Sequence, residues 1–187
     1  MKYTPTKVAG VTIVDIEPQR DHRGFSSRLF SAKEFDRYGL TFKVTETDVF
    51  FNYTRGTVRG LHFQVPPFVE SRLLRCTRGA IAAAVVDIRP DSQTFGDHMM
   101  VELNADNHRA LFLPPFVAYG FQTLTANTEV NYQVSGHREP ADEQGLRWND
   151  AEFGIEWPLP VTVISEEDAS WPAYAPRPVP IVSAASC

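Results

Sequence analysis

Cysteine is scarce in this sequence of 187 residues, which contains only Cys76 and Cys187. Two cysteines are too few for a disulfide framework or for a cysteine-based zinc site. Long hydrophobic runs are absent too, since no stretch approaches the roughly 18 to 20 apolar residues of a membrane-spanning helix. The N-terminal residues lack the apolar segment of a signal peptide, so we expect a cytoplasmic protein that does not enter the membrane.

Motifs for metals and nucleotides are also missing. The five histidines form no H-x-H or H-x-x-x-H pair, and a metal site needs about three converging ligands. The sequence contains no G-x-S-x-G, P-loop or G-x-G-x-x-G motif, which argues against acyl transfer, NTP hydrolysis and dinucleotide binding. We therefore expect neither a metal nor a cofactor.

Lysine contributes only four of the 18 basic residues, and the other 14 are arginine. With a net charge of −5, the sequence lacks the broad basic face of a nucleic-acid-binding protein. Five arginines nevertheless fall between Arg55 and Arg78. Because the guanidinium group suits carboxylate and phosphate oxygens, one interpretation is a local anion site. The alternative is that these arginines are exposed residues of surface strands.

The abundant residue types predict an all-β fold. Hydrophobic residues make up 43% of the sequence and aromatic residues 12%, enough for one domain with a real core over residues 1–187. Ile81–Val86 is apolar at every position, so we expect this strand to be covered on both faces. β-Branched and aromatic runs separated by turn residues predict short, closely spaced strands, typical of a sandwich or barrel. These runs are residues 44–53, 71–77, 80–89, 98–104, 109–114 and 128–134.

Helix signals are few. Ser31 and Glu34 form a capping box that predicts a short helix ending at Gly39, and Ser165 marks a second helix start. The tail from about Trp171 is rich in proline, so we expect it to be extended on the surface or on a partner subunit. Residues 11–14 predict a strand that pairs with something outside the main run of strands.

The segment Arg59-Gly60-Leu61-His62-Phe63-Gln64 concentrates side chains with useful chemistry. On a strand His62 and Gln64 project to the same side, and Arg59 approaches them only if Gly60 bends the chain. A histidine on the inner face of a barrel can act as a base near pH 7. The alternative is an ordinary core or surface histidine.

Tyr132 and Asp168 can each be interpreted as a functional residue or as an ordinary structural one. Tyr132 lies in an alternating strand, where its phenol can donate a proton or simply fill the mouth of a barrel. Asp168 follows the helix start at Ser165, and an acid in the first turn of a helix is favoured by the helix dipole alone.

Seven short motifs follow one another along the chain. They are R-G-F at residues 23–25, R-G-L-H-F-Q at 59–64, V-D-I-R at 86–89, S-x-T-F-G at 92–96, L-P-P-F-x-A-x-G-F at 113–121, W-N-D at 148–150 and I-x-W-P at 155–158. In this combination the sequence resembles the dTDP-4-dehydrorhamnose 3,5-epimerase family over most of its length.

The resemblance implies a cupin-type jelly roll with a few short peripheral helices, and a homodimer that exchanges strands between subunits. It implies metal-independent epimerisation of a nucleotide-linked 4-keto-6-deoxy sugar, in which a base removes a proton beside the ketone and an acid returns one from the other face. By the same resemblance His62 is the base, Asp168 orients its imidazole and Tyr132 is the acid. The positions that match substrate-binding residues are Arg23, Arg59, Gln64, Phe25, Thr47, Tyr119 and Arg138.

Three positions depart from the family pattern. Arg72 stands where the family has the lysine that stabilises the enolate, and arginine keeps the charge but not the point-like ammonium. Ala83 and Tyr119 replace an aspartate and a histidine. We hypothesise that this aspartate and histidine form one interacting pair, and that Ala83 and Tyr119 replace the two together.

The positions that match the nucleotide-binding end differ further. Ser26 and Arg138 replace aromatic residues that sandwich the base, and Arg28 replaces a glutamate. In the segment that corresponds to Q-D-N-x-S, the changed positions are Thr47, Val49 and Phe51. Stacking contributes roughly 1 to 3 kcal/mol per base, so these changes weaken the expected recognition of thymidine.

The sequence is therefore compatible with three functions. The favoured one is an isomerase that epimerises a nucleotide-linked 4-keto-6-deoxy sugar at carbons 3 and 5 or at one of them. The alternative is the same scaffold acting as an isomerase or cyclase on a carbonyl-containing natural product without a nucleotide. A non-catalytic ligand-binding cupin is the third, and the presence of His62, Asp168 and Tyr132 together argues against it.

Overall fold

A computed structural model of the chain describes residues 1–136 and 143–174. The six predicted strand runs all form strands, as β5, β7, β8, β9, β10 and β12. In chain order the elements within the described residues are β1 (Lys2–Pro5), β2 (Thr12–Asp15), β3 (Gln19–Asp21), β4 (Gly24–Ser26), α1 (Ala32–Arg37), β5 (Val44–Asn52), β6 (Val58–Gln64), β7 (Glu70–Arg78), β8 (Ala80–Asp87), β9 (His98–Asn104), β10 (Ala110–Leu113), β11 (Val117–Thr123), β12 (Thr128–Gly136), β13 (Glu143–Gly145) and α2 (Glu166–Ser170).

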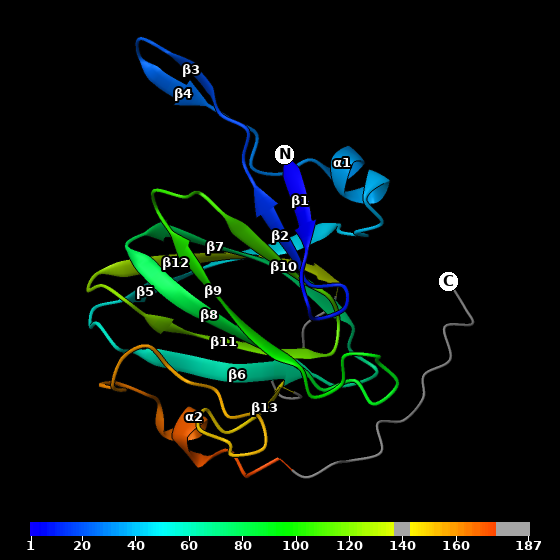
Figure 1. Cartoon of the computed structure of the whole chain (residues 1–187), viewed down its shortest axis with the longest axis vertical. Coiled ribbons are helices and arrows are strands. Elements are labelled where there is room, and N and C mark those ends of the chain that lie inside the picture. Colours follow the sequence, from blue (N-terminus) through cyan, green and yellow to red (C-terminus); the bar gives the residue numbers. More distant parts are fainter. Residues whose placement is uncertain (137–142, 175–187) are drawn as a thin grey trace.

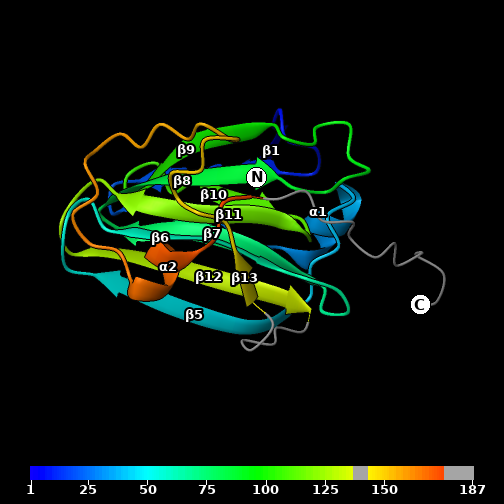
Figure 2. The same cartoon turned by 90° about the horizontal axis from the view of Figure 1, so that it is seen from below.

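The strands form two antiparallel sheets that pack face to face (Figure 1, Figure 2). One sheet has six strands in the order β1-β2-β10-β7-β12-β5, and the other has five in the order β13-β6-β11-β8-β9. From β5 to β8 each connection carries the chain from one sheet to the other. This alternation is that of a jelly roll, so the predicted all-β fold is confirmed.

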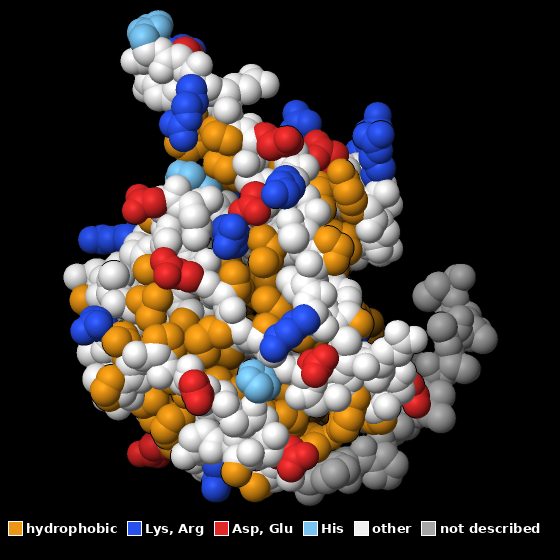
Figure 3. Space-filling view, viewed as in Figure 1, with side chains coloured by type: hydrophobic (Ala, Val, Ile, Leu, Met, Phe, Trp, Pro, Cys, Tyr) orange, Lys and Arg blue, Asp and Glu red, His pale blue; other side chains and the backbone are white. Residues whose placement is uncertain are grey.

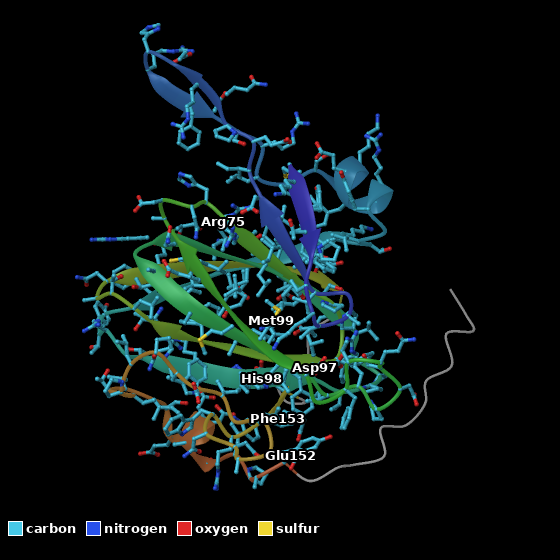
Figure 4. The ribbon with its side chains drawn as sticks, viewed as in Figure 1. Arg75, Asp97, His98, Met99, Glu152 and Phe153 are labelled. Atoms are coloured by element: carbon cyan, nitrogen blue, oxygen red, sulfur yellow. The ribbon has the colours of Figure 1, made fainter. Side chains whose placement is uncertain are left out.

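The main core fills the space between the sheets. Leu74 from the six-stranded sheet and Ile81 from the five-stranded sheet are both 0% exposed within it. The five-stranded sheet is covered on its outer face as well, because the C-terminal segment packs Phe153 (labelled in Figure 4) against Val86 of β8. The prediction that Ile81–Val86 is covered on both faces is confirmed.

Both short helices begin at the predicted caps. The Ser31 hydroxyl accepts a hydrogen bond from the Glu34 N–H at 3.4 Å, and the Ser165 hydroxyl accepts one from the Asp168 N–H at 3.0 Å. α1 packs Phe35 against the outer face of the six-stranded sheet, and α2 lies beside β6 in both views. No helix in the described part of the chain is long and apolar enough to cross a membrane.

Several strands differ from the sequence-based expectation, and β2 and β11 bear most directly on the main sheets. β2 pairs with β1, which lies outside the main run as expected, and it also pairs with β10 of the main run, which was not expected. β11 was not predicted, yet it joins β6 to β8. Its sequence is interrupted by Gly120, which weakens a strand pattern. The glycine is needed because a Cβ there would lie 2.5 Å from the Arg59 carbonyl oxygen.

β3 and β4 form a hairpin that stands away from both sheets (Figure 1). Every residue in its two strands is exposed. At its base, the buried Arg75 (Figure 4) donates hydrogen bonds to the Leu29 carbonyl at 3.1 Å and to the His108 carbonyl. Burial lowers the pKa of Arg75 to about 10. Arg75 therefore anchors the hairpin and is not an exposed strand residue.

The surface carries charges of both signs. On the face shown in Figure 3, acidic and basic side chains are interspersed around scattered apolar residues.

The proline-rich tail predicted from Trp171 is described only as far as Tyr174, so most of it lies outside the described residues. The assignment of the whole chain to one domain stays a prediction.

Candidate active site

His62 of β6 and Asp168 of α2 are in direct contact, although 106 residues separate them in the sequence. His62 Nε2 lies 2.6 Å from Asp168 Oδ1, and Asp168 Oδ2 accepts a hydrogen bond from the Gly60 N–H at 3.0 Å. Burial alone would raise the pKa of Asp168, but its interactions with His62 and Gly60 outweigh burial and hold this pKa below its ordinary value. An ionised carboxylate in this place orients the imidazole and stabilises it once it is protonated.

A bend in β6 brings Arg59 to the same side as His62. Gly60 has a φ of +100°, and the pairing of β6 with β11 shifts register opposite it. A Cβ at Gly60 would lie 2.7 Å from the Tyr119 carbonyl oxygen, so the position requires glycine for both its backbone angle and its space. Arg59 is then held by a hydrogen bond from its Nε to Asn52 Oδ1 at 2.8 Å.

Arg72 and Tyr132 reach the cavity from the six-stranded sheet, whereas Tyr119 of β11 pairs with His62 on the five-stranded sheet. The Arg72 guanidinium is 4.6 Å from the centre of the Tyr119 ring and 5.8 Å from that of Tyr132. Glu70 accepts a hydrogen bond from Arg72 Nε at 2.6 Å, and its Oε1 also lies 2.5 Å from Arg72 Nη2. Arg72 is 6% exposed. A buried guanidinium needs such a partner, and the contact with Glu70 fixes its orientation toward the cavity.

These side chains enclose a cavity of about 220 Å³. It is lined by Phe50, Arg59, His62, Arg72, Tyr119, Tyr132, Glu143, Ser165, Glu167, Asp168 and Trp171. A larger hollow of about 470 Å³ lies at the base of the hairpin, where Ser26 and Arg28 line it. We take the first as the candidate active site, because it holds a base, an acid and a cation within reach of one another.

Functional residues that sequence reasoning missed include Glu143 and Trp171, which line the cavity, and Glu70, which lies beside it. Glu143 Oε1 lies 3.8 Å from His62 Nδ1 and 3.6 Å from Arg72 Nη2, so the same carboxylate lies close to both side chains. Its place depends on the pairing of β13 with β6, which no local pattern reveals. Glu70 could have been found, since residues two apart on a strand share a face and Arg72 is its neighbour. The third, Trp171, was assigned to a surface tail but lines the cavity.

Several predicted substrate-binding residues lie elsewhere in the described chain. Gln64 is buried beside the cavity, in a small adjoining space near Glu70. Thr47 is exposed on the outer face of β5. Arg23 and Phe25 lie on the hairpin, where Arg23 is paired with Asp21. Arg138 lies outside the described residues.

The arrangement is suited to moving a proton at carbon. The Nε2–H of His62 donates to Asp168, which leaves Nδ1 as the basic nitrogen. The Arg72 guanidinium supplies positive charge for an oxyanion, and the Tyr132 phenol on the opposite sheet can donate a proton.

Comparison with known proteins identifies the family to which this site belongs. The family model for dTDP-4-dehydrorhamnose 3,5-epimerase matches residues 5–175. The chain belongs to the dTDP-4-dehydrorhamnose 3,5-epimerase family. A relative with that name from Sinorhizobium fredii is 36% identical over 180 residues, which cover 96% of this chain and 92% of the relative.

Solved structures of this epimerase family share the fold. The dTDP-4-dehydrorhamnose 3,5-epimerase from Bacillus anthracis, with TDP and pyrophosphate bound, superposes with a TM-score of 0.89 at 34% identity and covers 92% of this chain and 99% of its own. A 3′-monoepimerase from Streptomyces bikiniensis in complex with dTDP-quinovose gives a TM-score of 0.83 at 30% identity, covering 90% of this chain and 86% of its own. Relatives of the chain thus include enzymes that act at one carbon and enzymes that act at two.

Proposed function

We propose that this chain epimerises a nucleotide-linked 4-keto-6-deoxy sugar by transferring protons beside the ketone, without a metal. The observation that carries the proposal is the His62–Asp168 pair, at 2.6 Å, facing Arg72 and Tyr132 across one cavity. Relatives named as 3,5-epimerases and 3-epimerases support it. Epimerisation at carbons 3 and 5, at 3 alone or at 5 alone is compatible with the same catalytic groups.

The proton moves in two steps. His62 Nδ1 takes the proton from the carbon beside the ketone, and the electron pair of the C–H bond passes to the carbonyl oxygen, giving an enolate. Arg72 stabilises this oxyanion. Tyr132 then donates its phenolic proton to the opposite face of the same carbon, the ketone re-forms, and solvent restores the protonation states of His62 and Tyr132. The net change is inversion of one stereocentre.

We propose that Arg59 binds the diphosphate of the substrate. Its guanidinium is held in the cavity by Asn52 and lies 5.4 Å from the centre of the Phe50 ring. Arginine suits phosphate oxygens because its fork of donors can bind two of them at once.

We further propose a homodimer in which the β3–β4 hairpin reaches the partner subunit and brings Arg23 and Phe25 to its substrate. Support comes from the hairpin itself, because Phe25 stays 42% exposed although its ring contacts His108, and a two-stranded hairpin with so little packing is marginally stable in water. Its base, held by Arg75, gives it a fixed direction away from its own barrel.

The test is to follow dTDP-4-keto-6-deoxyglucose with the purified protein by proton NMR. We expect new sugar signals that show inversion at carbon 3, carbon 5 or both. Arg59→Met should raise the KM for the nucleotide-linked substrate at least 10-fold with a smaller effect on kcat. If the sugar is unchanged and calorimetry detects no binding, the proposal is wrong and a carbonyl compound without a nucleotide becomes the candidate substrate.

A further inference from the structure

Glu143 lines the candidate active-site cavity but takes no part in the proton transfer described above. It lies on β13 opposite Gln64, and Gly145 of the same strand lies opposite His62. Because residues opposite each other on paired strands share a face of the sheet, Glu143 is on the same face as His62 and diagonal to it. Its Oε1 is 3.8 Å from Nδ1 of His62. The carboxylate is therefore beside the atom that takes the substrate proton.

The same carboxylate oxygen also lies near the cation of the site. Glu143 Oε1 is 3.6 Å from Arg72 Nη2. Glu70 is closer to that guanidinium, at 2.5 Å from Nη2 and 2.6 Å from Nε, so Arg72 is already oriented without Glu143. A second carboxylate near Arg72 offsets part of the positive charge that an enolate needs. Since this position works against the oxyanion, Glu143 needs a role other than holding Arg72.

The two groups that Glu143 contacts fix where the reacting atoms of the substrate must lie. The proton that is removed meets His62 Nδ1, and the ketone oxygen meets Arg72. Because Glu143 Oε1 is 3.8 Å from the first and 3.6 Å from the second, it lies next to the substituents of the reacting carbon.

The two carbons beside the ketone of a 4-keto-6-deoxy sugar differ in what they carry. Carbon 3 has a hydroxyl group, whereas carbon 5 has a methyl group and the ring oxygen. An ionised carboxylate accepts hydrogen bonds and donates none. The hydroxyl on carbon 3 can therefore bind to Glu143, and the methyl group on carbon 5 cannot.

We propose that Glu143 is a specificity-determining residue: its carboxylate accepts a hydrogen bond from the hydroxyl on carbon 3 and so presents that carbon to His62. The inference rests on the proposed function and names the carbon that reacts faster. With carbon 5 in that place, a methyl group would desolvate the carboxylate without giving it a donor, which is costly. The two carboxylate oxygens offer about four acceptor sites, so the contacts with His62 and Arg72 leave room for the hydroxyl.

The main test compares the initial rates at which deuterium enters carbons 3 and 5 of dTDP-4-keto-6-deoxyglucose in deuterated water. We expect the wild type to label carbon 3 about 10-fold faster than carbon 5. Glu143→Met removes both acceptor oxygens and should bring the two rates close together, whereas Glu143→Gln keeps one acceptor and should retain a preference for carbon 3. Faster labelling of carbon 5 by the wild type, or a wild-type ratio in Glu143→Met, overturns the proposal.

Gln144→Met is the matched control. It places the same new side chain at the next position of β13, where side chains point to the opposite face of the strand. We expect the wild-type ratio in this variant. The ratio also separates specificity from a structural role, because a displaced Arg72 slows labelling at both carbons alike. An equal change of the ratio in Gln144→Met would show that any disturbance of β13 produces it, and would overturn the role of the Glu143 carboxylate.

A second measurement isolates the contact itself by removing its other partner. The 3-deoxy analogue of the substrate lacks the hydroxyl on carbon 3, and proton exchange at that carbon can still be followed. We expect the fall in kcat/KM from the full substrate to the analogue to be about 10-fold larger in the wild type than in Glu143→Met. Equal falls in the two proteins would show that Glu143 does not bind this hydroxyl.

These outcomes distinguish the inference from the proposed function. Exchange at both carbons in a ratio that does not depend on Glu143 overturns the inference and leaves the proposed epimerisation standing. No exchange at either carbon in the wild type contradicts the proposed function, and the inference with it.

Discussion

Arg72 is oriented by Glu70 before any substrate arrives. The two side chains sit two residues apart on β7 and share a hydrogen bond of 2.6 Å, with both residues 6% exposed. The carboxylate holds the guanidinium in place and at the same time offsets part of its charge. An oxyanion at this site therefore meets a fixed cation, where the family pattern has a lysine.

We predict that Arg72→Met lowers kcat about 100-fold to 1000-fold, the usual effect of losing one oxyanion-stabilising donor. Arg72→Lys keeps the charge and should stay within about 10-fold of the wild type. Steady-state kinetics with the nucleotide-linked keto sugar measure both. Because Arg72→Met leaves Glu70 without its cation, the double variant Glu70→Gln, Arg72→Met controls for loss of stability. An unchanged kcat in a folded Arg72→Met protein would remove Arg72 from the mechanism.

The sequence predicts the positions of some residues of the site and not of others. Arg59 and His62 could be placed together because Gly60 lies between them and a bend is the one way to bring both to a cavity. Asp168 was reached only through the family resemblance, since a contact across 106 residues leaves no local trace. Glu143 was missed for the same physical reason, because its position follows from strand pairing.

At the scale of elements, Ala83 and Tyr119 occupy neighbouring strands of the five-stranded sheet. Phe121 pairs with Ala83 and Tyr119 pairs with Val85, so residues 83 and 119 are diagonal neighbours, and both face the core between the sheets. Such neighbours are within reach of long side chains. The hypothesis that they replace one interacting pair is consistent with this placement.

We predict non-additive effects at these two positions. Ala83→Asp alone buries a carboxyl without a cationic partner and should lower stability by about 2 to 4 kcal/mol. Adding Tyr119→His should recover at least 1 kcal/mol of that loss through a new Asp–His contact. Urea unfolding of the wild type, both single variants and the double variant gives the coupling energy. A coupling energy near zero would show that the two exchanges are independent.

The hairpin offers a prediction about subunits. If Arg23 serves the cavity of the partner, then His62→Asn and Arg23→Glu homodimers are each inactive, but a mixed dimer contains one site with both native groups. Random mixing of equal amounts should therefore restore about a quarter of wild-type activity. Unfolding and refolding the two proteins together, followed by kinetics, measures this recovery. Recovery that stays at the level of the separate variants would place Arg23 outside the partner's site.

Elements whose signals are local were predicted well. The caps at Ser31 and Ser165 act on N–H groups three residues away, so sequence alone locates both helices. β11 was missed because the glycine that lets β6 approach also breaks the strand pattern. The hairpin was missed too, since its short polar strands have no apolar face for a periodicity to reveal.

At the scale of the whole molecule, Asp87 joins distant parts of the chain. It is 0% exposed at the end of β8 and accepts hydrogen bonds from Arg89, Ser92 and Thr94. Arg89 in turn donates to the Ala9 carbonyl at 2.7 Å. Burial alone would raise the pKa of Asp87, but these hydrogen bonds outweigh it and lower the pKa from 3.8 to about 2.

A pH dependence of stability follows. Because the folded-state pKa of Asp87 lies below its unfolded value of 3.8, its contribution is complete above that pH and is lost as the pH falls toward about 2. We predict that Asp87→Asn lowers the free energy of unfolding at pH 7 by about 3 kcal/mol and flattens the pH dependence between pH 4 and 2. Urea unfolding at several pH values measures both effects. Asp97→Asn, at an exposed carboxylate of the same turn, should match the wild type; a wild-type slope in Asp87→Asn would contradict the account.

The all-β fold as a whole could be predicted because several separate parts of the sequence indicate it. Six strand runs separated by turn residues indicate an all-β fold even though β11 was missed. The double burial of β8 follows from the same residue pattern. The pairing order of the strands did not follow, since β2 beside β10 depends on where the chain crosses between the sheets.

The most direct test of the central claim is exchange of substrate protons with solvent. Incubating the protein with dTDP-4-keto-6-deoxyglucose in deuterated water lets mass spectrometry and proton NMR detect deuterium at the carbons beside the ketone. We predict that the wild type and Tyr132→Phe both incorporate deuterium, because His62 removes the proton in each, while Tyr132→Phe forms little epimerised product. His62→Asn should incorporate at least 100-fold more slowly. Wild-type incorporation in His62→Asn would contradict the assignment of His62 as the base, and with it the account of this site.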